Sequence, residues 1–243
     1  MVHLQRRMFT SIRACAAPVQ RVLHVRAASC DAYNEPLNVL LLLGSSRAKR
    51  IGEKVAVDVG QRIEARGHSL SVMDPRESYE GFFMGLMEKA LFHYKEGQEA
   101  PPPQLLAAAE QVQAADAYVI VTPEMNHTIS PALTNMMNYF GGSMYANKTS
   151  GIVTYSAGMW GGARCGVALR AYLSELGCLP VSATAQLARA WRPGTFEAET
   201  GRLPEDCMGA KLTERMLDQM EWHARAMRAA RRRDEENAGL DIG

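Results

Sequence analysis

Apolar and polar positions follow two different periods along most of the chain. Short continuous apolar runs, typical of strands buried on both faces, alternate with stretches in which apolar residues recur every three or four positions, as in a helix. Val55, Val59 and Ile63 show the helical spacing. The runs predict strands at 38–43, 68–74, 117–122, 148–156 and 178–187, and the longer stretches predict helices at 53–67, 104–115, 131–140, 167–177 and about 208–233.

Strands that alternate with helices through short connections predict a parallel, doubly wound sheet. We therefore expect an α/β protein with five parallel strands between two layers of helices. Segment 75–103 interrupts the alternation, because the triple proline at 101–103 breaks any helix there. The segment also holds an apolar patch that belongs either to the core or to a dimer surface: Phe82, Phe83, Met84, Leu86 and Met87.

The first 30 residues differ in composition from the rest. They contain five arginines and no acidic residue, and Leu4, Met8 and Ile12 share one face of a predicted helix. Such an amphipathic, Arg-rich start is typical of an organelle transit peptide. We expect residues 1–35 to target the protein to a mitochondrion or plastid and residues 36–243 to form the folded domain. The alternative is a disordered tail on a cytoplasmic protein.

The remaining residues carry 22 Lys and Arg against 26 Asp and Glu, a net charge of −4. A mildly acidic domain of this kind predicts no nucleic-acid partner. No apolar stretch approaches the length of a membrane span. The five cysteines are widely spaced and form no CxxC pair, which argues against a disulfide framework and a structural zinc site. We expect no bound metal.

Polar loops follow three of the predicted strands. In a doubly wound sheet, ligands bind outside the carboxyl ends of the strands, so these loops should converge on one crevice. The first, GSSRAKRIG, leads into a helix whose N–H groups favour an anion. Ser45, Arg47 and Arg50 add donors suited to one terminal phosphate. The alternative is a strand–helix turn capped by Ser45, with exposed arginines.

The second and third loops suit a flat ligand. Pro123 stiffens the second loop, where Glu124 and Asn126 could bind the edge of a heteroaromatic ring; the alternatives are a helix-capping role for Glu124 and an Asx turn at Asn126. The third loop, SAGMWGGARCG, is rich in glycine, which lets a backbone approach a ligand closely or makes a tight turn with Trp160 packing. Together the loops predict a mononucleotide with a large planar ring.

Three stretches resemble the signature motifs of the NAD(P)H-dependent FMN reductases, a flavodoxin-like group that includes quinone, azo and chromate reductases. They are GSSRAKRIGEKVA, PEMNHTISPALTN and SAGMWGGARCGVALRAYLSELG, and the likeness extends over roughly residues 37–233. The resemblance implies a flavodoxin-like fold, FMN as cofactor and NAD(P)H as co-substrate. It also implies a cofactor site made of Ser45, Arg47, Arg50, Ile51, Gly52, Pro123, Glu124, Met125, Asn126, Ser156, Gly158, Gly161, Gly162 and Arg164.

The chain departs from the family pattern at three of these positions. Many members have Ser and Asn where this chain has Arg50 and Gly52, and most have Tyr where it has Met125. A methionine thioether can still pack against a flavin ring. The departures at 50 and 52 shift the expected phosphate contacts to Arg50 and to backbone N–H groups.

The resemblance implies a ping-pong reaction in which hydride passes from NAD(P)H to FMN and then to a quinone-like or flavin acceptor. The cofactor carries this chemistry, so we expect no catalytic side chain. It also implies a homodimer or tetramer. A flavodoxin-type electron carrier and a flavin-free scaffold protein are the alternatives. Cys165, beside Arg164, is either a redox-sensitive thiol or a small buried filler.

Overall fold

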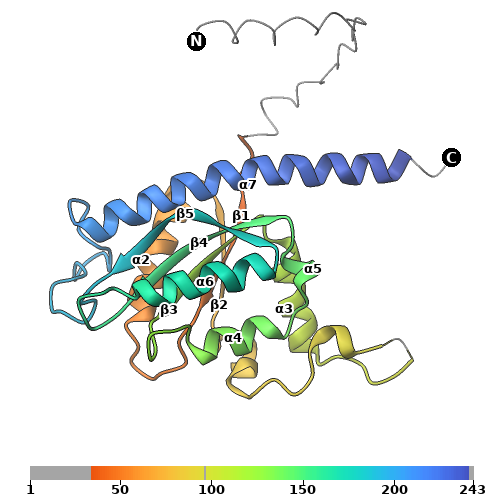
Figure 1. Ribbon diagram of the computed structural model, residues 1–243, viewed down its shortest axis with the longest axis horizontal. Coiled ribbons are helices and arrows are strands. Elements are labelled where there is room, and N and C mark those ends of the chain that lie inside the picture. The colour runs from red at the N-terminus through yellow and green to blue at the C-terminus, as the bar shows by residue number, and fades with distance from the viewer. Residues whose placement is uncertain (1–33, 96, 241–243) are drawn as a thin grey trace, which may run out of the picture.

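The computed structural model describes residues 34–95 and 97–240, and its centre is one parallel sheet (Figure 1). The predicted transit peptide falls almost wholly on residues 1–33, outside the described residues. The strand order is β2-β1-β3-β4-β5 and every pairing is parallel. All five predicted strands are confirmed: β1 Asn38–Leu43, β2 Ser69–Met73, β3 Ala117–Pro123, β4 Lys148–Tyr155 and β5 Cys178–Leu187.

Helices cover both faces of the sheet, so the predicted three-layer α/β/α architecture is confirmed. The helices are α2 Gly52–Ala65, α3 Pro103–Ala114, α4 Pro131–Asn138, α5 Gly142–Tyr145, α6 Ala163–Glu175 and α7 Met208–Leu240, with 3-10 turns η1 Ser78–Met84 and η2 Leu91–His93. α2 and α7 pack on one face with one hydrophobic cluster, and α3, α4 and α6 pack on the other face with a second cluster.

The alternation of side chains along β1 explains how one strand serves both clusters. Val39, Leu41 and Leu43 face α2, while Leu40 and Leu42 face the opposite layer, and all five are buried. Burial of each such side chain stabilises the fold by roughly 1.5–3 kcal/mol. A continuous apolar run is therefore what a strand between two helical layers requires.

The structure differs from the predicted elements in three places. α6 begins at Ala163, four residues before the prediction, α7 continues to Leu240, and the short helix α5 was not predicted. The early start of α6 depends on a side chain from a distant loop, described below. A helix of three or four residues such as α5 has too little periodic sequence to be recognised.

The irregular segment after β2 contains both core and surface. Phe83 is buried and packs edge-on against Phe82 and Tyr139. Met84 and Leu86 are exposed, Leu86 at 86% of its surface. The apolar patch predicted as either core or interface thus divides into an inner and an outer part.

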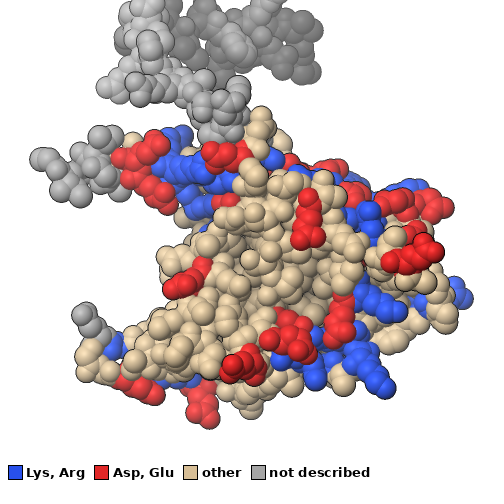
Figure 2. Space-filling model, turned by 180° about the vertical axis from the view of Figure 1, so that it is seen from behind, with Lys and Arg blue, Asp and Glu red and all other residues tan. Residues whose placement is uncertain are grey.

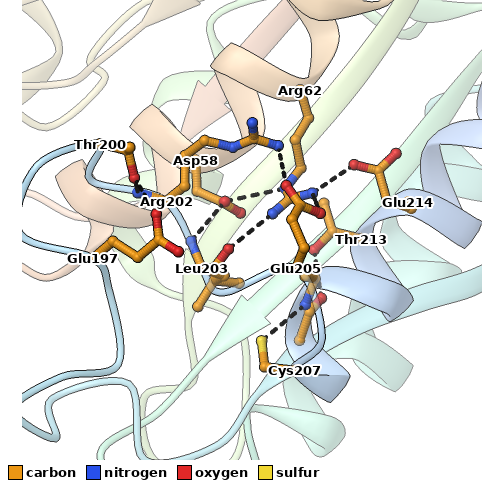
Figure 3. A network of polar contacts seen from close by, with 12 residues as sticks. Asp58, Arg62, Glu197, Thr200, Arg202, Leu203, Glu205, Cys207, Thr213 and Glu214 are labelled. Carbon is orange, nitrogen blue, oxygen red and sulfur yellow. Dashed lines mark hydrogen bonds and ion pairs between the residues drawn. The ribbon is translucent and has the colours of Figure 1, made fainter.

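A buried network of charges holds the C-terminal part of the chain against α2 (Figure 3). Asp58 and Arg62, whose side chains are both fully buried, form an ion pair of 3.1 Å within α2. Asp58 Oδ1 also accepts a hydrogen bond of 2.9 Å from the Leu203 N–H, and Arg62 donates to Glu214 of α7 at 2.6 Å. These contacts anchor both the loop before α7 and α7 itself.

The described residues contain neither a membrane-spanning helix nor a cluster of metal ligands. None of their helices combines the length and apolar character needed to cross a bilayer. Nor do three or more potential metal-binding side chains come together in this part of the chain.

Candidate cofactor-binding site

The three polar loops follow the carboxyl ends of β1, β3 and β4, which are neighbours in the sheet. Strand order reverses at β1, because β2 lies on one side of it and β3 on the other. Ligands of doubly wound sheets bind at such a reversal. The expected crevice therefore has its structural basis in the strand order.

The first loop places an open helix end beside polar side chains. α2 begins at Gly52, and the residue before it, Ile51, is half-buried and provides no side-chain cap. The first N–H groups of α2 are therefore available to an anion. Ser45 is buried at the end of the loop nearest β1, whereas Arg47 is exposed and can reach a ligand.

Arg50 is not presented to solvent. Its side chain is 1% exposed, forms an ion pair with Asp74 and donates to the Ser45 carbonyl. Its Nε lies 3.1 Å from a Glu53 carboxylate oxygen. These contacts favour a positioning role for Arg50 over the direct phosphate contact expected from the sequence.

Asp74 is a site residue that sequence reasoning missed. Besides Arg50, it accepts a hydrogen bond of 2.8 Å from the Arg76 N–H, and Arg76 donates to the Ser46 carbonyl at 3.1 Å. The segment after β2 thus supports the first loop. The available signal was an acid as the last residue of a predicted strand, at the same edge of the sheet as the polar loops.

The second loop is a tight two-residue hairpin. Met125 and Thr128 exchange two backbone hydrogen bonds of 3.1 and 2.9 Å across it. Asn126 and His127 at its tip have φ of 48° and 62°. Asn tolerates this left-handed conformation better than most residues. The hairpin exposes Asn126, keeps Met125 half-buried and follows directly from Pro123 at the end of β3.

Glu124 joins the second loop to the third. One carboxylate oxygen accepts hydrogen bonds of 3.0 and 3.2 Å from the Arg164 and Cys165 N–H groups, and the other lies 3.1 Å from Arg164 Nη1. The alternative of a helix-capping role for Glu124 is therefore confirmed, and the helix is α6. This cap explains why α6 begins before the predicted residue.

Glycines of the third loop serve different purposes. Gly161 and Gly162 have φ of 60° and 86°, and a side chain at Gly162 would lie 2.6 Å from Thr154. Packing and backbone conformation therefore require both. Gly158 has open space around it, with nothing closer than the Ser156 hydroxyl at 4.0 Å. Of the three, Gly158 is the glycine whose surroundings allow the predicted close approach to a flat ligand.

Apolar side chains stand exposed on the same loop. Met159 and Trp160 are 61% and 60% exposed. The Arg164 guanidinium lies 5.4 Å from the Trp160 ring centre, a cation–π distance. Glu124, Arg164 and Trp160 therefore form a connected series from the second loop to the surface of the third, and Trp160 packs against Arg164 while most of its ring stays exposed.

Cys165 lies beneath this series and is fully buried. Burial, followed by the nearby Glu124 carboxylate, raises the pKa of the thiol to about 12. A thiol that is protonated and inaccessible at neutral pH is unreactive. The interpretation of Cys165 as a redox-sensitive thiol is therefore wrong, and the buried-filler alternative is correct.

The residues present fit a flavin mononucleotide. The uncapped start of α2, with Ser45 and Arg47 beside it, suits a terminal phosphate. The hairpin and Gly158 leave backbone accessible for a planar ring. A buried hydroxyl of Tyr155, which has no hydrogen-bond partner in the described part of the chain, lies at the phosphate end.

Comparisons with known proteins agree with this geometry. A 31% identical stretch of 144 residues, covering 58% of this chain and 71% of the relative, is shared with a quinone reductase of Escherichia coli. An NAD(P)H-dependent FMN reductase of Pseudomonas aeruginosa is 28% identical over 130 residues, which cover 52% of this chain and 69% of the relative.

Solved structures share the fold. The flavoenzyme NAD(P)H:(acceptor) oxidoreductase FerB of Paracoccus denitrificans superposes with a TM-score of 0.59 at 18% identity, covering 77% of this chain and 98% of that one. An oxidoreductase of Corynebacterium diphtheriae gives 0.54 at 14% identity, covering 79% and 96%. The sequence profile of NADPH-dependent FMN reductases matches residues 37–192, most of the described chain. The chain belongs to the NADPH-dependent FMN reductase family.

Proposed function

We propose that this member of the family binds FMN in the crevice formed by the three loops and reduces a quinone-like or flavin acceptor, with NAD(P)H as the hydride donor. The observation that carries the proposal is the convergence of the loops at the strand reversal. Glu124 connects the second loop to the third, and Tyr155, at the end of β4, reaches Gly52 at the end of the first.

The redox chemistry is supplied by FMN when it is bound: a hydride from NAD(P)H, with a proton from water, ends on the acceptor. The chain's own residues bind and orient. Ser45, Arg47 and the first N–H groups of α2 hold the phosphate. The 123–126 stretch and Ser156–Gly158 border the ring. Arg164, fixed by Glu124, provides positive charge that stabilises the electron-rich ring.

Steady-state turnover tests this function. With NADPH and a simple benzoquinone varied together, the proposal predicts parallel lines in double-reciprocal plots, because the two substrates occupy the same place in turn. An absence of quinone-dependent NADPH oxidation by flavin-containing protein would contradict it. In that case the electron-carrier alternative would remain, although a net charge of −4 over residues 31–243 is weak for electrostatic docking to redox partners.

We also propose that residues 1–35 direct the protein to a mitochondrion or plastid. The five arginines and the absence of acidic residues within the first 30 residues support this. A fluorescent protein fused behind residues 1–35 should enter an organelle. Diffuse cytoplasmic fluorescence would contradict the proposal.

Finally, we propose a homodimer or tetramer. Leu86 and Met84 are exposed apolar residues beside the buried Phe83. Figure 2 shows a mostly uncharged surface that is hollowed between two projecting parts of the molecule. Exposed apolar surface of this kind is typical of subunit contacts.

A further inference from the structure

Tyr155, the last residue of β4, is a buried tyrosine with an unusual environment. It is 1% exposed, and its ring lies 6.1 Å from that of Trp191. Its hydroxyl makes no hydrogen bond of normal geometry within the described part of the chain. Buried hydroxyl groups nearly always have a partner, and one without a partner costs about 1–3 kcal/mol. Its surroundings therefore indicate what a partner would be.

The hydroxyl lies at the start of α2. A Cβ atom placed on Gly52, the first residue of that helix, would be 2.4 Å from the Tyr155 oxygen. The hydroxyl thus occupies the space that a side chain at position 52 would use. A polar group is therefore present at the start of α2, and it comes from β4.

The charges around the hydroxyl suit an anion. The helix start has no side-chain cap, and Ser45, Arg50 and Arg47 lie near the hydroxyl together with one carboxylate, that of Glu53. Burial raises the pKa of Tyr155, and the neighbouring Ser45 hydroxyl, Arg50 and Arg47 offset only part of that rise. At neutral pH the group is accordingly a hydrogen-bond donor, which is what a phosphate dianion requires.

We propose that the Tyr155 hydroxyl donates a hydrogen bond to the terminal phosphate of the bound flavin, from the space that a side chain at position 52 would otherwise fill. This inference rests on the proposed function. It adds a phosphate-binding residue from β4 and explains why Gly52 and Tyr155 occur together in this chain: either a side chain at 52 or the tyrosine hydroxyl fits, but not both.

The test compares FMN with riboflavin, which differ only in the phosphate. In Tyr155→Phe, we expect affinity for FMN, measured by flavin fluorescence quenching, to fall about tenfold or more, while affinity for riboflavin stays within twofold. The melting temperature of the flavin-free protein should stay the same or rise, because an unpaired buried hydroxyl has been removed. Equal affinity for FMN in the variant and the wild type, or an equal loss for both flavins, would overturn the inference.

Tyr118→Phe is the matched control. Tyr118 is also buried in the sheet, but its hydroxyl donates to the Val112 carbonyl at 2.8 Å, away from the loops. This change should lower the melting temperature and leave the ratio of FMN to riboflavin affinity unchanged. If wild-type protein binds neither flavin, the proposed function itself fails. If it binds FMN normally and Tyr155→Phe does too, only the role of Tyr155 fails.

A reciprocal exchange provides a second test. Gly52→Asn alone should weaken FMN binding, because the new side chain collides with the hydroxyl. The double variant Gly52→Asn/Tyr155→Ser removes the collision and places a polar side chain at position 52. We expect it to bind FMN more tightly than either single variant. Strictly additive losses would show that the two positions do not share one space and one ligand, against the inference.

Discussion

Glu124 is the residue on which the geometry of the site most depends. Its carboxylate accepts hydrogen bonds from the first N–H groups of α6 and forms an ion pair with Arg164, and its side chain is only 9% exposed. The residue was recognisable from the sequence as part of a polar loop. Its partners were not, because they lie 40 residues further along the chain. Spacing rules for capping concern residues within one turn of the helix.

Removing this carboxylate should loosen the site. In Glu124→Ala we expect the free energy of unfolding to fall by about 1–3 kcal/mol, because buried donors lose a charged acceptor. FMN affinity should fall as well. Urea denaturation measures the first effect and fluorescence quenching the second. The control Glu64→Ala, at an exposed position of α2, should change neither. Unchanged stability in Glu124→Ala would show that the cap is dispensable.

Trp160 tests the acceptor side of the reaction. Since its ring is 60% exposed on the third loop, we expect it to stack with planar acceptors. Trp160→Ala should raise KM for a quinone about fivefold to tenfold, the loss of roughly 1–1.4 kcal/mol of stacking. The KM for ferricyanide, which has no ring to stack, and the FMN content should stay unchanged. Trp160→Phe should recover most of the quinone KM. An equal effect on both acceptors would contradict this role.

At the scale of elements, the contact between α2 and α7 is the feature that sequence patterns did not reveal. Both helices were predicted from apolar periodicity, but the ion pair that joins them runs from Arg62 of α2, which also pairs with Asp58, to Glu214 of α7. Charged residues on a helix are usually solvated. The strands were predictable because each is an uninterrupted apolar run. Long-range ion pairs leave no comparable signal in a single sequence.

Breaking the ion pair between Asp58 and Arg62 should destabilise the protein strongly. Arg62→Met leaves the fully buried Asp58 without its cation, for which we expect a loss of about 3–5 kcal/mol. The double variant Asp58→Leu/Arg62→Met removes both charges, and its loss of stability should be clearly smaller than the sum of the losses in the two single variants. Urea denaturation of the wild type, the two single variants and the double variant completes this double-mutant cycle. Additive losses would mean that the two charges act independently.

The same interface predicts a dependence of stability on pH. Burial lowers the pKa of His68 below its ordinary 6.5, more than the nearby Glu221 raises it. Burial raises the pKa of Glu214, but Arg66 and Arg62 outweigh it, so the pKa lies below the ordinary 4.5. In both cases the unfolded chain binds protons that the folded chain does not. The contribution of these two groups to stability is therefore complete above pH 6.5 and is lost on acidification.

Urea midpoints measured from pH 8 to pH 4 should fall in two stages, first through the His68 range and then through the glutamate range. His68→Asn keeps an acceptor for the Leu37 N–H, which His68 Nδ1 accepts at 3.3 Å, but does not titrate. It should remove the first stage alone. A flat profile in the wild type, or two stages in the variant, would contradict this assignment.

At the scale of the whole molecule, the exposed apolar residues after β2 predict self-association. Because Leu86 is 86% exposed, Leu86→Glu should leave the melting temperature within about a degree and shift the protein toward monomer in sedimentation experiments. Leu106→Glu, at another exposed apolar position, is the control and should leave the assembly intact. A wild-type monomer at micromolar concentration would refute the proposed assembly.

The central claim, that this fold binds a flavin that NAD(P)H reduces, is tested most directly by the visible spectrum of protein comprising residues 36–243. We predict a yellow protein that loses its absorbance on anaerobic addition of NADPH and regains it when a quinone is added. A colourless protein that cannot be reconstituted with FMN would contradict the account. The flavin-free scaffold alternative, with Met125 and Arg50 as the responsible departures from the family, would then be favoured.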